Sequence, residues 1–285
     1  YLPEMTASVS MEVDTMLMTG VSITDIRGTA NTSPDRVTVE NASARMFDGS
    51  MAGSMVWNVP RPERTNLTFK GRLDTVEAAA FFEEFAIMGE DSDFHDYVSG
   101  SFSAQTDYYT EIDVYLSPVI PSTESEGNFG MTKMRLKGHP AQEKVAELLK
   151  TPKLSNAAMD EWQSRYTIEN SVLTLEDLRL TSGNIGGELN GTQHLENGRM
   201  DFGMRLYLPG SVAGRMGDVL PKQAVSALEQ DNGTVMLPLR ISGTAGNPKV
   251  GPDMDTIEPI VKQYLKEQAK DKAKDAVKGL LDRFN

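Results

Sequence analysis

The side chains that most often carry out chemistry are sparse and scattered in this sequence. The three histidines, His95, His139 and His194, lie in predicted loops or turns and belong to no HxxxH or HxxE spacing. Cysteine is absent, which excludes disulfides and thiolate metal sites. We interpret the histidines as ordinary surface residues and expect neither a catalytic residue nor a metal site.

Two further motifs have simpler structural explanations. The run Gly183-Asn184-Ile185-Gly186-Gly187 leads into a predicted strand and lacks the lysine and the helix of a phosphate-binding loop. Asp253 and Asp255 are explained by the start of a helix, where carboxylates cap free N–H groups. No GxSxG nucleophile elbow occurs. We therefore predict a protein that is not an enzyme and has no cofactor.

Charge narrows the range of partners. The 285 residues include 28 basic and 41 acidic ones, a formal net charge of −13. Nucleic-acid binding depends on neutralising phosphates with Lys and Arg, so we expect no nucleic-acid partner. The charge also disfavours adhesion of the whole body to an anionic membrane. The sequence begins at Tyr1 and has no run of about 18 apolar residues, so we expect a soluble fragment or processed product.

Period-2 alternation of apolar and polar residues is the dominant pattern, and it predicts antiparallel strands with one apolar and one solvated face. We expect these strands to form curved sheets, as an open gutter or half-barrel, in a mainly β fold with flanking helices. The apolar members of the strands are the candidates for lining a groove: Val9, Met11, Val13, Val37, Val39, Met51, Met55, Leu67, Phe69, Leu173, Leu175, Ile185, Leu189, Met200, Phe202, Met204, Leu206, Val235, Leu237, Leu239 and Ile241.

Turn and helix signals divide the chain further. Asn197-Gly198 predicts a tight type I′ hairpin, and residues 118–127 have loop composition. Helices are predicted at 74–88, where Asp74 and Glu77 suggest a capping box, and at 140–150, after Pro140. Weaker helix patterns cover 155–163 and 212–230. We expect a β-rich repeat over 1–150, a second over 151–252, and a C-terminal helix over 253–285.

An internal repeat supports this division. Residues 37–44 align with 173–180 at an offset of 136, and residues 49–55 align with 183–189 at an offset of 134. Both copies have apolar pairs on either side of an acidic corner, followed by a Gly-rich turn and another strand. Chance similarity between glycine-punctuated strands is the alternative, but the matched order of features favours duplication.

The C-terminal helix differs in charge from the rest. Residues 260–285 contain seven Lys or Arg and four Asp or Glu, net +3, which leaves −16 for the remainder. The apolar groups at its two ends are joined only by alanines, and four-residue steps rotate this stripe around the helix. It either packs at its start and continues into solvent, or acts as an arm that contacts a membrane or a protein partner.

The C-terminal third resembles the C-terminal region of AsmA-like proteins. The resemblance rests on the strand–corner–strand run 166–180, on Gly183–Gly187 and on the alternating strand 200–208. It continues through Val235-Met236-Leu237-Pro238-Leu239-Arg240-Ile241-Ser242-Gly243-Thr244 and Asn247-Pro248-Lys249-Val250. It covers about residues 160–285 well and the first half more loosely, and its motifs are structural.

The resemblance implies a location and a function. AsmA-like proteins are anchored in the inner membrane by an N-terminal helix, which would precede this chain, and their bodies lie in the periplasm. They are related to TamB-like and bridge-like lipid-transfer proteins with an apolar β-sheet gutter. The expectation is a periplasmic lipid-binding or lipid-transfer module of the cell envelope that contributes to phospholipid transport and outer-membrane homeostasis, with a phospholipid or other acyl-chain lipid as partner.

Alternation alone does not decide what covers the apolar face. In a closed sandwich it packs against a second sheet, whereas in a gutter part of it contacts a lipid chain. The 16 methionines are suited to a surface that accepts varied apolar partners, although they also fill cores. The alternative is a structural or assembly protein of the envelope with a closed core, which recruits a partner.

Overall fold

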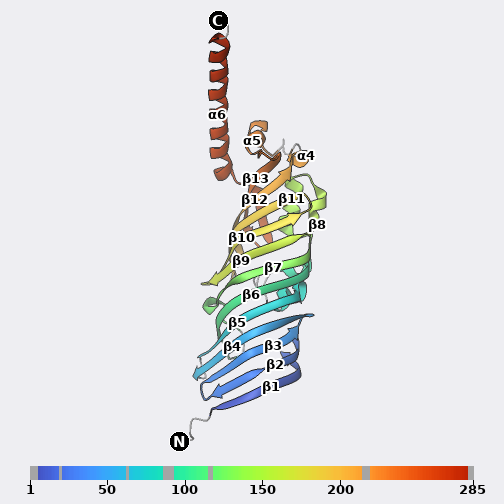
Figure 1. Cartoon of the computed structure of the whole chain (residues 1–285), viewed down its shortest axis with the longest axis vertical. Coiled ribbons are helices and arrows are strands. Elements are labelled where there is room, and N and C mark those ends of the chain that lie inside the picture. Colours follow the sequence, from blue (N-terminus) through green and yellow to red (C-terminus); the bar gives the residue numbers. More distant parts are fainter. Residues whose placement is uncertain are drawn as a thin grey trace.

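The computed structural model describes residues 6–18, 21–61, 64–85, 93–114, 118–213 and 219–281. Its strands join into one open antiparallel sheet, stacked along the long axis of the molecule (Figure 1). The strands are β1 (Ala7–Met18), β2 (Val21–Ser33), β3 (Arg36–Met46), β4 (Gly49–Arg61), β5 (Arg64–Glu77), β6 (Val98–Ile112), β7 (Glu124–Lys137), β8 (Asn156–Met159), β9 (Glu161–Glu169), β10 (Val172–Ser182), β11 (Ile185–His194), β12 (Arg199–Pro209), β13 (Thr234–Thr244) and β14 (Asn247–Pro252). The predicted fold class is confirmed.

Each strand pairs with its neighbour in the chain, except that β8 pairs only on the edge of β7 and β9 takes the next place in the sheet. The pairing continues across residue 150 through β7 and β9, where Gly127 lies opposite Tyr166. The two halves of the chain therefore share one continuous sheet.

The sheet has one apolar and one solvated face. Residues directly opposite each other in antiparallel strands point to the same side, and the pairs Val39–Met55 and Met55–Phe69 illustrate the apolar one. On the other side lie exposed ion pairs between neighbouring strands, among them Lys70–Asp107 and Arg240–Asp201. We call these two sides the apolar face and the outer face.

β-bulges keep the apolar residues on one face along each strand. Asp25, Asn41, Thr75, Lys133 and Asp177 have positive φ angles of 51° to 54°, and register shifts occur beside all five. A bulge adds one residue, so apolar side chains three apart point to the same side, and it bends the strand. The bulges therefore curve the sheet without breaking its one-sided pattern.

The structure contains the predicted duplication. The β2–β3 and β3–β4 pairs Ser33–Arg36 and Met46–Gly49 reappear 136 residues later as Glu169–Val172 and Ser182–Ile185. The bulge residues Asn41 and Asp177 are also 136 apart, with φ angles of 51° and 52°. The two-residue gap in the sequence alignment was wrong, because the pairing keeps one offset through the Gly-rich turn.

Several predicted helices and turns need correction. The helix expected at 74–88 is α1 (Ala78–Phe85), because β5 continues to Glu77, and residues 86–92 lie outside the described ones. Glu77 caps it, since its carboxylate accepts hydrogen bonds from the N–H groups of Ala79 and Ala80 at 3.2 and 2.6 Å. The short helix α2 (Phe94–Tyr97) follows.

Helix α3 (Pro140–Leu148) confirms the prediction at 140–150. The helix predicted at 155–163 is wrong, since those residues belong to a short 3₁₀ turn (Pro152–Ser155), β8 and β9. These residues form strands because they pair with β7. The region 212–230 contains the end of α4 (Gly210–Ala213) and α5 (Lys222–Ala227), with residues 214–218 outside the described ones.

Two predicted connections also differ in detail. Asn197-Gly198 does join two strands, with Gly198 at φ 64°, but the connection spans residues 195–198 instead of two residues. The predicted loop 118–127 contains a 3₁₀ turn (Ile120–Ser122) and then becomes β7 at Glu124.

In the C-terminal helix α6 (Met254–Leu281), the side chains described up to Lys274 pack only at the start of the helix. Ile257 is buried in the core, whereas Lys262 to Lys274 are exposed except for the half-buried Tyr264. Asp253, not Asp255, precedes the helix and accepts a hydrogen bond from the Thr256 hydroxyl at 2.5 Å. Figure 1 shows α6 projecting away from the sheet along the long axis.

Two clusters of buried residues form the core. One contains residues of β2 to β7 with Phe81 of α1, and the other contains residues of β9 to β13 with Val145 and Leu149 of the α3 segment. They meet at Phe129 and Trp162, which pack against both.

The bulge geometry predicts opposite effects of glycine at two exposed lysines of β7. Lys133 has a φ of 53°, which is costly for a residue with a Cβ, whereas Lys137 has no such angle. Lys133→Gly should leave the free energy of unfolding unchanged or raise it by up to about 1 kcal/mol. Lys137→Gly should lower it by about 1 kcal/mol. Urea unfolding measures both, and equal destabilisation would contradict the bulge at Lys133.

His139 precedes α3 and predicts a pH dependence. Burial lowers the pKa of His139 to about 4, and its ring packs against Phe94 and Tyr97 with centroid distances of 5.7 and 5.4 Å. The unfolded chain binds this proton near pH 6.5 and the folded one only near pH 4, so stability is lost as the pH falls through this window. When the pH falls from 7 to 5, the free energy of unfolding should decrease in both proteins, but by about 2 kcal/mol less in His139→Gln than in the wild type. Identical pH profiles would refute the buried neutral histidine.

Candidate functional site

The register places all 21 groove candidates on the apolar face of the single sheet. In the first half, Val37 lies opposite Trp57, Trp57 opposite Leu67, and Met51 opposite Leu73. In the second half, one row runs across three strands through Leu189, Met204 and Leu239. The candidates thus share one side of the molecule, but they differ in what covers them.

In the C-terminal half, the chain itself fills the space over the apolar face. Leu237 and Leu239 have no exposed surface, and Leu206 retains 2 %. The other buried candidates are Leu173, Leu175, Phe202, Met204, Val235 and Ile241, and the half-buried Ile185, Leu189 and Met200 pack against the same cluster. All twelve candidates of this half therefore belong to the C-terminal core cluster or pack against it, which leaves no candidate here outside the core.

Helices account for this closure. α3 leaves the sheet after β7 and packs against β14, at the far edge. α5 packs against the start of α6, which in turn contacts β13. Val145, Leu220, Leu228 and Ile257 from these segments complete the C-terminal core cluster.

In the N-terminal half the apolar face is open. We define the open half as the apolar face of β1 to β5, where Val9 and Val13 are 49 % and 39 % exposed. The remaining candidates there are half-buried, except the buried Val39: Met11, Val37, Met51, Met55, Leu67 and Phe69. Among the described residues, Val9, Met11, Val13, Val37, Met55, Leu67 and Phe69 belong to neither core cluster.

Glycines shape the floor of the open half. Gly53 and Gly71 lie opposite each other on β4 and β5, between the Met55–Phe69 and Met51–Leu73 pairs. A Cβ on Gly71 would come within 2.5 Å of the carbonyl oxygen of Ala52 and of the Phe69 ring, so only glycine fits there. The Phe69 ring therefore lies over bare backbone, and the row between the two apolar pairs has no side chains.

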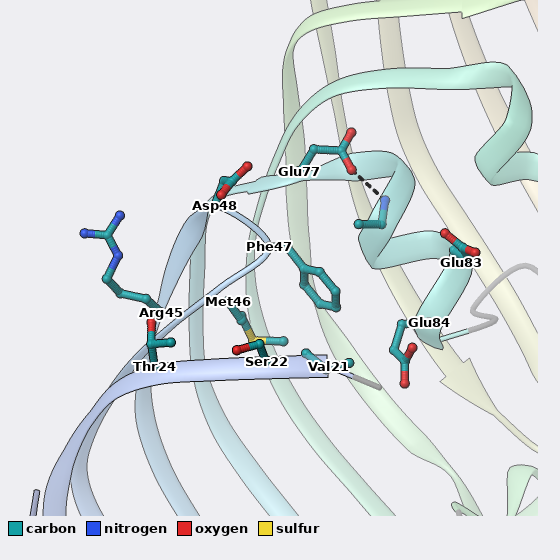
Figure 2. A pocket seen from close by; sticks show the side chains of 11 residues that line it. Val21, Ser22, Thr24, Arg45, Met46, Phe47, Asp48, Glu77, Glu83 and Glu84 are labelled. Atoms are coloured by element: carbon teal, nitrogen blue, oxygen red, sulfur yellow. Dashed lines mark hydrogen bonds between the residues drawn. The ribbon is translucent and has the colours of Figure 1, made fainter. Parts of the chain in front are cut away.

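A cavity of about 720 Å³ lies at the end of this half, beside α1. Val21, Met46 and Phe47 provide its apolar lining, and Figure 2 shows Phe47 between the β3–β4 turn and the helix. Asp48, Glu77, Glu83 and Glu84 give it an acidic rim, and Arg45 is the one basic side chain among its described lining residues. Glu77 is already engaged in capping α1 (Figure 2).

A group of hydroxyl side chains interrupts the apolar face between the two halves. These side chains come from β6, β7, β9 and the residue before β7, and they lie on the same side as Phe69 and Ile168. They are Thr106, Tyr108, Thr110, Thr123, Ser125 and Tyr166. We call these six residues the hydroxyl belt. The Tyr166 hydroxyl donates a hydrogen bond to Thr106 Oγ1 at 2.6 Å and lies 3.2 Å from Ser125 Oγ, and Thr110 and Thr123 pair at 2.9 Å.

Sequence reasoning missed the hydroxyl belt. The strand 98–112 does show an alternation, with Phe102 and Ala104 followed by Thr106, Tyr108 and Thr110. Midway along the strand, the positions that face the apolar side change from apolar to hydroxyl-bearing residues, so the alternation in hydrophobicity is lost. Alternation of Thr, Tyr and Ser was the signal that could have identified it.

Buried polar groups add a second feature of this face. The indole Nε1 atoms of Trp57 and Trp162 are buried and have no hydrogen-bond partner among the described residues. An indole N–H usually finds a partner when it is buried, since leaving it unpaired costs about 1–3 kcal/mol. Burial also raises the pKa of the Tyr108 phenol, whose hydroxyl lies near Thr110 and Thr123.

The remaining candidate chemistry stays dispersed. The interpretation of His139 as an ordinary surface residue was wrong, because its ring is half-buried among the aromatic rings of Phe94 and Tyr97. His95 lies beside Asp96 in α2 at 3.6 Å. Within the described ranges, no group of three or more His, Asp or Glu side chains could hold a metal ion. None of the helices in those ranges has both the length and the apolar character needed to cross a membrane.

Comparisons with known proteins add no relative. No family model matches the chain, and neither the curated proteins nor the solved structures gave a match.

The open half and the buried core predict different rates of methionine oxidation. Dilute hydrogen peroxide should oxidise Met11, Met16 and Met55 early, as it should the exposed Met254, because these side chains are exposed or half-buried. Met131 and Met134, at 3 % and 1 % exposure, should react at least about tenfold more slowly, since the core must open first. Peptide mass spectrometry over a time course measures the rates. Similar rates in both groups would contradict an open N-terminal half.

Proposed function

We propose that this protein is a lipid-binding module of a bacterial cell envelope, which holds an acyl chain against the open half of its sheet. The observation that carries the proposal is the one-sided exposure of β1 to β5. Within the described residues no second sheet covers this face. Val9, Met11, Val13, Val37, Met55, Leu67 and Phe69 belong to neither core cluster, whereas the end of the face beside α1, which includes Val21, Met46 and Leu73, belongs to the N-terminal cluster. An apolar surface of this kind is favoured when a non-aqueous partner covers it.

The dimensions suit a single hydrocarbon chain. Four inter-strand steps of about 4.8 Å make the open half about 19 Å long in the stacking direction. One leaflet of a bilayer core is about 15 Å thick, half of roughly 30 Å. At about 0.8 kcal/mol per buried CH₂, a 16-carbon chain supplies on the order of 10 kcal/mol before the entropy cost of binding.

The side chains of the open half suit a flexible hydrocarbon ligand. Met11, Met51 and Met55 are flexible and polarisable, and the Phe69 ring lies over a glycine backbone. The resemblance to AsmA-like proteins points the same way and suggests a periplasmic location, a tether in the inner membrane, and a contribution to phospholipid transport and outer-membrane homeostasis.

The rival function is a structural or assembly protein without a lipid. The filled C-terminal core and the exposed part of α6 favour it, since α6 offers lysines such as Lys266 and Lys270 to a partner. Under this alternative, the open half would be covered by protein and would not bind acyl chains.

The two tryptophans allow a direct test, because they are the only ones in the chain. Trp162→Phe leaves Trp57, which lies in the open half between Val37 and Leu67. Adding a phospholipid with brominated acyl chains should quench Trp57 emission in a saturable manner, whereas the same lipid without bromine should not. Met55→Glu should weaken binding at least about tenfold, because it places a charge under the chain.

Ser54→Glu is the matched control, since Ser54 faces the other way, opposite Lys70. It should bind the brominated lipid as the Trp162→Phe parent does. Absence of quenching with folded protein and excess lipid would refute the proposed function.

A further inference from the structure

We propose that the hydroxyl belt is a subsite for the neutral acyl-ester linkage of the lipid whose chain lies on the open half. This inference rests on the proposed function and adds a position and a chemical specificity to it. Its basis is the place of the belt, at the point where the open apolar face ends.

The belt directly continues the rows of the open half. Phe69 of β5 lies opposite Tyr108, which lies opposite Ser125, and Leu67 lies opposite Thr110. A hydrocarbon chain lying across β1 to β5 along the stacking direction therefore meets hydroxyl groups at β6. Beyond the belt the apolar face continues into the filled C-terminal core, where Leu173 is 4 % exposed, so the chain has no further path there.

The α-helices on this face pack away from the belt, whereas the 3₁₀ turn Ile120–Ser122 packs at its Thr110 end, where the Val119 carbonyl oxygen accepts hydrogen bonds from Thr110 and Thr123. α1 and α2 contact β6 near Phe102, which stacks on Phe81 at 4.7 Å, and α3 packs on β14. Thr106, Tyr108 and Tyr166 remain half-buried, not buried. Thr110, Thr123 and Ser125 are buried, so the half-buried three are the members of the belt that a ligand on the open half would contact.

The chemistry of the belt selects a neutral polar group. The rows through it consist of uncharged residues: Phe69, Tyr108, Ser125, Ile168, Gly71, Thr106, Gly127 and Tyr166. No lysine or arginine occurs in these rows to balance a phosphate, and an unpaired buried charge is strongly disfavoured. An ester carbonyl needs only hydrogen-bond donors, which hydroxyls provide.

Trp57 supplies a further donor near this position. Its indole N–H is buried without a partner among the described residues, and it lies in the row of Leu67 and Thr110. A carbonyl between Trp57 and the belt would satisfy this donor, whereas a pure hydrocarbon would leave it unpaired.

The test compares two phospholipids with the same headgroup and chain length, one with ester-linked and one with ether-linked chains. Both lipids carry the same brominated chains, and their binding to the Trp162→Phe protein is followed by the quenching of Trp57 emission. The ester lipid should bind about three- to tenfold more tightly, the effect of one neutral hydrogen bond. Tyr108→Phe and Tyr166→Phe should each reduce this preference, while the affinity for the ether lipid stays the same.

Tyr109→Phe is the matched control, because Tyr109 lies on the outer face opposite Thr68, and it should keep the full preference. Equal affinity of the parent for both lipids would overturn the subsite and leave the proposed function intact. Belt variants that weaken both lipids equally would show a structural role and would also overturn it. Binding of neither lipid would overturn the proposed function itself.

Discussion

The structure depends on keeping most apolar strand residues on the same side of one long sheet, with a few, such as Val56 and Met236, on the outer face. Cross-strand pairing transmits the side from each strand to the next, from Val9 opposite Ala30 to Ile241 opposite Val250. A single register slip would move a strand's apolar residues into water. The bulges at Asp25, Asn41, Thr75, Lys133 and Asp177 make the pattern compatible with curvature, since each resets the alternation where the strand bends.

Because the sheet is apolar on one side, that side must be covered, and the two halves of the chain differ in how they cover it. The C-terminal half buries its apolar face under α3, α5 and the first turns of α6, and its central leucines have no contact with solvent. Among the described helices, α1 and α2 pack on the N-terminal half and cover its Phe102 end. The pairing pattern of residues 33–49 recurs at residues 169–185, so the two halves share this strand pattern and differ in the helices that pack on it.

The two sheet edges are also unequal. β14 is six residues long and contains Pro248, Lys249 and Pro252, all of which discourage further strand pairing. β1 is twelve residues long and contains neither proline nor lysine. The open apolar face therefore extends to an edge that carries none of these protective residues.

The sequence predicted the parts of the fold that alternation encodes. The strands containing Met11, Phe69, Met204 and Leu237 were identified by it, and the repeat was visible because the Asn41 and Asp177 corners are alike. Strands rich in hydroxyl residues, such as β6, were not identified, because Thr and Tyr give no contrast in hydrophobicity. Residues 155–163 were assigned to a helix because pairing with β7, a long-range contact, cannot be seen in a local pattern.

For the site, the sequence identified the correct face but not its division. Leu237 and Met55 have equivalent alternation patterns, and only the packing of distant helices distinguishes the covered residue from the open one. The glycine row was visible as composition, yet its role depends on the register that places Gly53 opposite Gly71. Coverage is a tertiary property, so it lies beyond what periodicity can predict.

Native mass spectrometry of the chain, purified without detergent and then mixed with phospholipid, tests the central claim most directly. The account predicts a saturable complex of defined stoichiometry, with mass increments that equal the added lipid. A spectrum of bare, folded protein at saturating lipid would contradict it, since the apolar face of β1 to β5 would then have no affinity for acyl chains.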